Sequence, residues 1–188
     1  MGHAREGSRI WRLNLGAGSR GEPTFINVDL RQRPGIDVLA DVRALPFRRR
    51  SVAEVQAIAL LEHFADPYQV LDEIHRIITP QARVYFAVPA LGTYGAHLDP
   101  DHRFLADLKL WQEILGGYYR SVQVRPLGVR YRSSKLLVAL LHLLVRGLRM
   151  YDLAQAWVFL CRRPRRPERR YIPWWLEERY GSPPERAR

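Results

Sequence analysis

Residues 13–30, LNLGAGSRGEPTFINVDL, contain two short apolar runs separated by a glycine-rich turn, and the second run ends on a carboxylate. The first run, residues 10–15, has the pattern of a β-strand and continues directly into Gly16 and Gly18. The second run, residues 25–29, ends at Asp29. Glycine lets a backbone approach a ligand closely and tolerates the positive φ of such a turn. The stretch therefore predicts neighbouring strands that end at a ligand-binding turn and an acidic side chain.

Strand-like and helix-like segments continue to alternate along the chain. Apolar runs predict further strands at 36–41, 55–61, 84–88, 122–124 and 156–160. The 55–61 run is nearly continuous in apolar residues, which is typical of a strand buried on both faces. Helical spacing predicts helices from Asp66-Pro67 to Pro80, over 104–115 with Gly116-Gly117 ending it, and over about 133–150. This alternation favours an α/β fold with a mostly parallel sheet, in which ligands bind beyond the carboxyl ends of the strands.

Composition and charge limit the function classes. The 188 residues are 47% hydrophobic and 26% charged, which predicts a folded domain, and the formal net charge of +11 favours anionic partners. The single cysteine, Cys161, excludes an intramolecular disulfide and a cysteine-cluster metal site. The first residues lack the apolar core of a signal peptide, and the longest apolar stretch, 136–145, is about half of the ~20 residues that a membrane span needs. We therefore expect a cytoplasmic protein without a transmembrane segment.

Three features fall at consecutive predicted strand ends and together favour a nucleoside site. The glycine turn follows the first strand, Asp29 ends the second and Asp41 ends the third. Asp29 can accept hydrogen bonds from both ribose hydroxyls, and Asp41 can accept one from an exocyclic amine beside the free N–H of Val42. For either aspartate alone, a strand-end cap or a salt bridge to an arginine is an equally good interpretation. A phosphate loop is excluded because the chain has no Gly-Lys-Ser/Thr motif.

With these motifs the sequence resembles the class I S-adenosylmethionine-dependent methyltransferases, in the branch of the ubiquinone-biosynthesis enzymes. The resemblance runs from Leu13 to about Phe104, through the segments 13–18, 28–30, 41–47, 61–64 and 71–76, then Pro80 and Val88-Pro89. It implies a Rossmann-like, doubly wound, mostly parallel sheet of about seven strands with the last strand antiparallel. The short link from Gly18 to Asp29 and the short N-terminal segment predict that the N-terminal helices are reduced. We expect the domain to span 1–161 and a basic, Pro/Arg-rich tail to follow at 162–188.

The resemblance implies S-adenosyl-L-methionine as the cofactor. The turn at 16–18 would face its methionine portion, Asp29 its ribose, Asp41 with Val42 its adenine, and Leu61 and Glu62 the methyl donor. Asn14 stands where the family usually has an acidic residue, and Arg20 replaces the third glycine of the turn. The predicted cofactor-binding residues are Asn14, Leu15, Gly16, Ala17, Gly18, Asp29, Leu30, Asp41, Val42, Leu61 and Glu62.

The Gly/Pro-rich loop 89–104 is the candidate lid over the acceptor, since functional residues concentrate in such loops. Methyl transfer from a sulfonium is a one-step displacement that depends on in-line geometry and exclusion of water, and a base helps when the acceptor is a hydroxyl. The predicted catalytic residues are His97, His63 and His102, with His97 favoured as the base. The predicted acceptor-binding residues are Tyr94, His97, Asp99 and Arg103.

Two alternatives concern the same loop. Asp101 is a good candidate for the N-cap of the following helix, which would place His102 and Arg103 in its first turn. A divalent metal site of His97, Asp99 and His102 is disfavoured, because no firm ligand motif is present, so no metal is predicted.

Three functions stay open at the level of sequence. A methyltransferase acting on a small molecule, such as a sugar, a glycan precursor or another metabolite, is favoured. An RNA methyltransferase using the arginines of 162–170 beside Trp174-Trp175 is less favoured, because residues 61–64 read LEHF instead of Asn/Asp-Pro-Pro-aromatic. A non-catalytic cofactor-binding scaffold is the third. The missing N-terminal helices predict that either the 133–150 helix or a second subunit, as in a homodimer, covers the bare sheet face.

Overall fold

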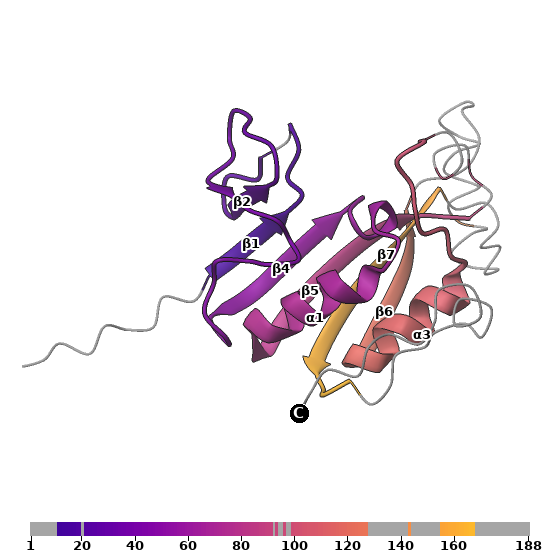
Figure 1. The fold of residues 1–188 in the computed structure, drawn as a ribbon. Helices are drawn as coiled ribbons and strands as arrows, with labels where there is room; N and C mark the ends of the chain where they lie inside the picture. The colour runs from indigo at the N-terminus through magenta and orange to yellow at the C-terminus, as the bar shows by residue number, and fades with distance from the viewer. Residues whose placement is uncertain are drawn as a thin grey trace, which may run out of the picture.

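A seven-stranded sheet of order β3-β2-β1-β4-β5-β7-β6 forms the centre of the computed structural model, which describes residues 11–19, 21–91, 93, 96, 99–127, 143 and 155–167 (Figure 1). The strands are β1 Trp11–Leu15, β2 Ile26–Asp29, β3 Val38–Leu39, β4 Val52–Ile58, β5 Ile78–Pro89, β6 Tyr119–Leu127 and β7 Ala156–Pro164. The pairs from β3 through β5 are parallel, and β7 runs antiparallel to β5 and to β6. The predicted α/β sheet, mostly parallel with an antiparallel last strand, is confirmed.

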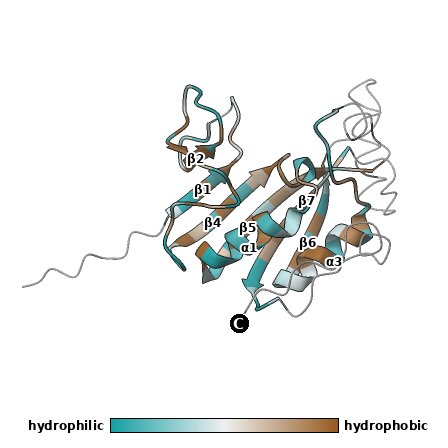
Figure 2. Ribbon diagram, viewed as in Figure 1, coloured by the Kyte–Doolittle hydropathy of each residue, from teal (hydrophilic) through white to brown (hydrophobic). Residues whose placement is uncertain are grey.

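Helix α1, Pro67–Ile77, begins as its sequence predicts. The Asp66 side chain accepts a hydrogen bond from the N–H of Tyr68 at 3.0 Å, and Pro67 occupies the first turn. Hydrophobic residues recur at helical spacing between hydrophilic ones, so one face of the helix is buried against the sheet (Figure 2). The helix ends before Pro80, which was expected to stop it, because Ile78 already starts β5 and pairs with Val52 of β4.

Helix α3, Leu108–Tyr118, begins later than its sequence predicts. Its N-cap is Asp107, whose Oδ1 accepts a hydrogen bond from the N–H of Leu110 at 2.7 Å. The prediction that Asp101 caps this helix is therefore wrong, and His102 and Arg103 lie before the helix rather than in its first turn. The backbone N–H of Asp101 instead donates to Asp99 at 2.9 Å, within the loop.

The predicted end of this helix is wrong as well. Gly116 and Gly117 belong to its last turn, and α3 ends at Tyr118 because Tyr119 begins β6. The Tyr118 hydroxyl hydrogen-bonds with Asp72 of α1 at 2.6 Å, and its ring stacks on that of Tyr68 at 6.4 Å. These contacts join α1 and α3 on one face of the sheet (Figure 1).

Among the described residues no helix connects β1 to β2, as expected from the short link between Gly18 and Asp29, and none connects β2 to β3. A polar network holds these links instead. Asn14 donates to Asn27 Oδ1 at 2.9 Å, the N–H of Glu22 donates to the same oxygen at 2.7 Å, and Asp37 accepts from the N–H of Asn27 at 2.7 Å. Buried polar groups that are hydrogen-bonded in this way hold a link without an apolar helix face.

The sheet is covered less completely than predicted for the 55–61 run. In β4, Val55 and Ala57 are buried, but Gln56 between them is half-buried and Ile58 is 47% exposed. The expectation of a strand buried on both faces is therefore wrong for β4. The covering helix predicted for 133–150 lies outside the described residues, apart from Leu143.

The last strand extends beyond the expected domain boundary at residue 161. β7 continues to Pro164, and the N–H of Arg165 donates to the carbonyl of Tyr118 at 2.8 Å. The first residues of the segment 162–188 therefore belong to the sheet, and residues 168–188 lie outside the described part. Within that described part, no helix has the length and apolarity needed to cross a membrane.

Candidate active site

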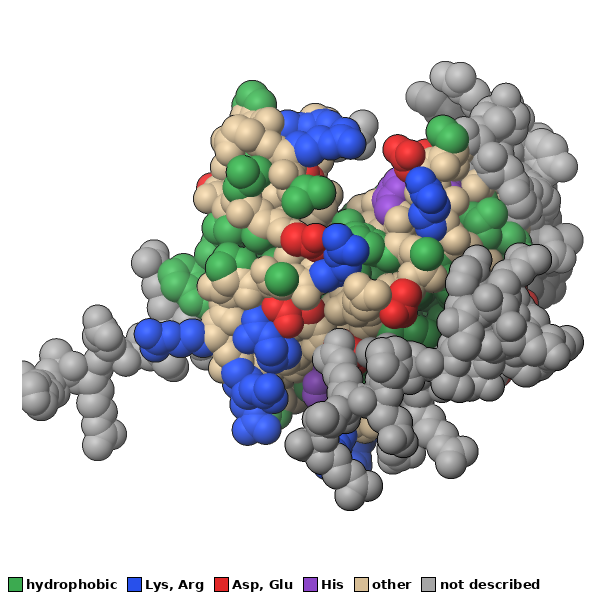
Figure 3. Space-filling model, in the orientation of Figure 1, with side chains coloured by type: hydrophobic (Ala, Val, Ile, Leu, Met, Phe, Trp, Pro, Cys, Tyr) green, Lys and Arg blue, Asp and Glu red, His purple; other side chains and the backbone are tan. Residues whose placement is uncertain are grey.

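A cleft of about 450 Å³ lies at the carboxyl ends of β1, β2 and β4. The turn after β1, the end of β2, the end of β4 and the loop before α3 supply its lining, which includes Gly16, Gly18, Asp29, Ala59, His63 and Arg103. The surface is hollowed above the end of β4, with basic, acidic and histidine side chains around the hollow (Figure 3). Its volume falls within the range of roughly 300–1,000 Å³ that is typical of small-molecule sites.

The glycine turn after β1 has the geometry that its sequence predicts. The φ angle is +65° at Gly16 and +59° at Gly18, and the N–H groups of Gly16 and Ala17 donate to the carbonyl of Val28. A Cβ at Gly16 would lie 2.7 Å from Leu60 Cδ1, whereas a Cβ at Gly18 would meet nothing within 4 Å. The positive φ therefore favours glycine at both positions, and at Gly16 a Cβ would in addition displace the end of the Leu60 side chain.

Asp29 is fixed by two backbone donors at the end of β2. Its Oδ2 accepts a hydrogen bond from the N–H of Gly18, and its Oδ1 accepts one from the N–H of Arg31, both at 2.8 Å. An ionised carboxylate has about four acceptor positions, so each oxygen retains capacity for a further donor. Asp29 thus faces the cleft in one orientation, ready to accept from two hydroxyl groups.

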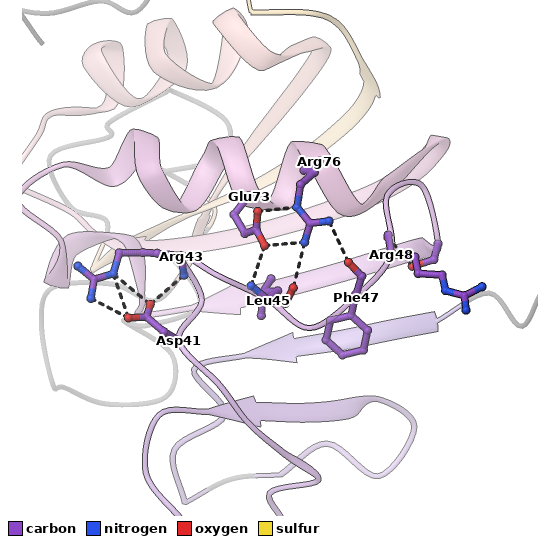
Figure 4. Close-up of polar contacts among 8 residues, drawn as sticks. Asp41, Arg43, Leu45, Phe47, Arg48, Glu73 and Arg76 are labelled. Carbon is purple, nitrogen blue, oxygen red and sulfur yellow. Dashed lines mark hydrogen bonds and ion pairs between the residues drawn. The ribbon is translucent and has the colours of Figure 1, made fainter. Parts of the chain in front are cut away.

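Asp41 lies beyond the short strand β3 and pairs with Arg43. The closest contact joins Asp41 Oδ2 and Arg43 Nη2 at 2.7 Å, and the N–H of Arg43 donates to Oδ1 at 2.9 Å (Figure 4). Hydrogen bonding to the Arg43 side chain lowers the pKa of Asp41. Asp41 and Val42 are not among the residues that line the cleft, so their contact with adenine stays a prediction.

An ion pair on α1 holds the segment 41–47 in place. Glu73 Oε1 accepts from the N–H of Leu45 and from Arg76, each at 2.7 Å, and Arg76 donates to the carbonyls of Leu45 and Phe47 (Figure 4). Burial alone would raise the pKa of Glu73, but hydrogen bonds from Arg76 and Leu45 lower it overall. The sequence analysis missed this pair, although Glu73 and Arg76 have the i,i+3 spacing of helical ion pairs.

Glu62 is the most unusual side chain of the site. It is 1% exposed, and within the described part of the chain neither of its carboxylate oxygens has a hydrogen-bond partner. Burial raises the pKa of Glu62, while its own backbone N–H and the nearby histidines oppose that shift. Its backbone carbonyl accepts from the N–H groups of Arg103 at 2.7 Å and Phe104 at 3.0 Å, which attaches the 99–104 loop to the end of β4.

His63 and His102 lie beside Glu62, although the two histidines are 39 positions apart in the sequence. Their ring centroids are 5.0 Å apart in an edge-to-face arrangement. One possible ligand atom from each of Glu62, His63 and His102 lies within 4.8 Å of the others. Asp99 Oδ2 lies 3.7 Å from His102 Nε2. The structure therefore brings together two of the predicted catalytic histidines, and Tyr94 and His97 lie outside the described residues.

The remaining predicted residues divide by exposure. Asn14, Leu15, Ala17, Val42 and Leu61 are buried, and Leu30 is 67% exposed; none of these is among the lining residues of the cleft. Arg31 and Arg33 do line it, and the sequence analysis missed both. Their position in the sequence could have indicated this role, because they directly follow the strand that ends at Asp29.

Comparisons with known proteins show what this segment and this fold are similar to. Residues 20–86 match a family model described as a methyltransferase domain. A search of curated protein sequences gives no match. Among solved structures, the chain is similar to a SAM-dependent methyltransferase from Archaeoglobus fulgidus, with 14% identity, 83% of this chain and 86% of that chain covered, and a TM-score of 0.58.

Two further structures share the fold. A phosphoethanolamine N-methyltransferase 2 from Haemonchus contortus, in complex with S-adenosyl-L-methionine, is 14% identical over 84% of this chain with a TM-score of 0.58, and this chain covers half of its length. The [4+2]-cyclase SpnF is 14% identical over 82% of this chain and 75% of that chain, with a TM-score of 0.56. None of the matches distinguishes the ubiquinone-biosynthesis branch. The matched segment 20–86, the sheet order and the glycine turn beside Asp29 give the chain the fold of the S-adenosylmethionine-dependent methyltransferases.

Proposed function

We propose that this chain binds S-adenosyl-L-methionine in the cleft beyond β1, β2 and β4 and transfers the methyl group to a hydroxyl of a small anionic molecule. The observation that carries the proposal is the pairing of the Gly16–Gly18 turn with Asp29, whose carboxylate is held by the N–H of Gly18 at 2.8 Å. The two glycines of this turn leave room for the methionine portion, and the fixed carboxylate suits the two ribose hydroxyls.

Positive charge at the cleft supports an anionic acceptor. Arg31, Arg33 and Arg103 all line it, and among the described residues none of their guanidinium groups has an ion-pair partner. Arginine binds carboxylate and phosphate through two parallel hydrogen bonds. An acceptor that carries such a group next to a hydroxyl would be oriented by these side chains. The predicted roles of Tyr94, His97 and Asp99 in acceptor binding remain part of the proposal.

The residues beside the cleft suit a direct displacement. The acceptor oxygen forms the new bond to the methyl carbon, and the bonding electron pair of the methyl–sulfur bond stays on sulfur. The hydroxyl proton passes to a base, for which His63 lines the cleft and His102 is adjacent to it. His97 stays a predicted base. We place the reaction in the cytoplasm, in keeping with the buried free thiol of Cys161.

Calorimetric titration of S-adenosyl-L-methionine into the purified chain tests cofactor binding. We expect one site, with affinity lowered at least about 10-fold in Asp29→Ala, because two hydrogen bonds to a charged group are lost. Arg83→Ala, on β5, is the matched control and should bind as the wild type does. A wild-type chain that binds no S-adenosyl-L-methionine would overturn the proposal.

The acceptor class needs a second measurement, because SpnF shows that this fold also occurs in a cyclase. Transfer of a labelled methyl group should occur to hydroxylated phosphate or carboxylate compounds and should fall in Arg33→Ala. Transfer to RNA, with salt-sensitive binding, would favour the RNA alternative. Cofactor binding without transfer to either class would support the scaffold.

A further inference from the structure

We propose that Glu62, His63 and His102 form a binding site for a divalent transition-metal ion of the Zn²⁺ type beside the cleft. Two imidazoles and one carboxylate are a ligand set that such ions accept, and a position left open can take water or a substrate oxygen. One possible ligand atom of each residue lies within 4.8 Å of the others.

The carboxylate of Glu62 is the first independent observation. It is 1% exposed, and both oxygens lack a hydrogen-bond partner among the residues that the structure describes. A buried charge is costly unless it is paired with another charge or coordinates a metal. In the described part of the chain no basic side chain forms an ion pair with Glu62. A bound cation would satisfy this carboxylate at the place where it is buried.

The hydrogen bonds of the two imidazoles are the second observation. His63 Nδ1 lies 3.3 Å from the carbonyl of Asp101, and His102 Nδ1 lies 3.0 Å from the carbonyl of Ala96. A carbonyl only accepts, so each Nδ1 must carry the proton that it donates. In the neutral form of each ring, Nε2 then keeps its lone pair. Metal-binding histidines in general donate their other N–H to a carbonyl or carboxylate in this way, which fixes the ring and its tautomer.

The distances between the possible ligand atoms of Glu62, His63 and His102 would fit a metal ion after small rotations of these side chains. A tetrahedral Zn²⁺ with bonds of about 2.1 Å needs ligand atoms about 3.4 Å apart. The three residues are already within 4.8 Å, and His102 is held next to Glu62 by the hydrogen bonds from the N–H groups of Arg103 and Phe104 to the Glu62 carbonyl. Asp99, with its Oδ2 3.7 Å from His102 Nε2, adds negative charge beside the site.

A metal at this position would also give the acceptor hydroxyl a partner. A bound Zn²⁺ lowers the pKa of a coordinated hydroxyl or water and holds its oxygen in one place. With His63 and His102 bound to the metal, neither would act as the base named for the metal-free reaction, so the acceptor oxygen would lose its proton to solvent before it attacks the methyl carbon. This role rests on the proposed function, whereas the metal site itself does not.

Titration of ZnCl₂ into the chelator-treated full chain, followed by calorimetry, tests the site. The wild type should bind one Zn²⁺ tightly, and Glu62→Gln and His102→Ala should each weaken binding at least about 10-fold. His75→Gln on α1 is the matched control and should leave Zn²⁺ binding unchanged. All variants keep His3, His97 and His142, so a site formed by those residues would persist.

A spectroscopic measurement covers the case that Glu62→Gln does not fold. Co²⁺ added to the wild type should give visible absorption of the intensity typical of four-coordinate sites with nitrogen and oxygen ligands, and His63→Ala should lose it. A wild type that binds no Zn²⁺, or binding that is equal in Glu62→Gln, His63→Ala and His102→Ala, would overturn the metal site. Zn²⁺ binding without S-adenosyl-L-methionine binding would refute the proposed function and leave the site standing.

Discussion

At Gly16 the positive φ of +65° and the side chain of Leu60 both oppose a Cβ. We predict that Gly16→Ala lowers the free energy of unfolding by roughly 1–2 kcal/mol, because an L-residue pays that much in the left-handed region. Urea denaturation measures the change. Gly116→Ala is the control, since Gly116 lies within α3 with open space around it and should gain about 0.5–1 kcal/mol. Equal stability of Gly16→Ala and wild type would contradict the assignment of this turn.

The sequence predicted individual residues well where a local rule applied and poorly where a distant contact decided. Gly16, Gly18 and Asp29 could be recognised because a turn between two strand patterns needs glycine and a strand end offers a carboxylate. Glu62 could not be recognised as a buried, unpartnered carboxylate, because its burial depends on the 99–104 loop that its carbonyl holds.

The start of helix α3, which the structure places after Asp107 and not after Asp101, can be tested by mutation. Asp107 Oδ1 accepts from the N–H of Leu110 at 2.7 Å. Asp107→Ala should therefore lower the free energy of unfolding by about 1 kcal/mol, the usual effect of losing an N-cap. The comparison is Asp101→Ala, which should change it by less than about 0.5 kcal/mol. Thermal or urea denaturation of both variants checks this, and a larger loss in Asp101→Ala would return the cap to Asp101.

Helix α1 carries a pH dependence through Glu73. The pKa of Glu73 is lowered in the folded chain, so its contribution to stability is present above its ordinary pKa of 4.5 and is lost as pH falls through the lowered value. Glu73→Gln should lower the free energy of unfolding by about 1–2 kcal/mol at pH 7, because Arg76 loses a charged partner.

Urea denaturation of wild type and Glu73→Gln at pH 7 and at pH 3 measures that difference. The deficit of the variant should shrink as the pH falls, because protonation of Glu73 in the wild type progressively removes its charge. If the free energy of unfolding of Glu73→Gln were lower than that of the wild type by the same amount at both pH values, the packing of the Glu73 side chain and not its charge would hold the 41–47 segment.

Across the whole molecule, the sequence predicted the strands, and with them the architecture of the sheet, more reliably than it predicted the ends of the helices. Strands β1, β2, β4 and β5 were predicted because their apolar runs are local, and the carboxyl ends of parallel strands meet at one edge. The coverage of the sheet was not predicted correctly, since the exposure of Ile58 in β4 depends on which helices lie over it. The meeting of His63 with His102 was beyond local patterns for the same reason.

The claim on which the account rests is that the cofactor occupies the cleft between the glycine turn and Asp29. A crystal structure of the chain with S-adenosylhomocysteine bound tests it most directly. We predict ribose hydroxyls within hydrogen-bonding distance of the Asp29 carboxylate, the homocysteine portion along Gly16 and Gly18, and adenine toward Asp41. A ligand bound at any other surface, with the Asp29 carboxylate left facing solvent, would contradict the account.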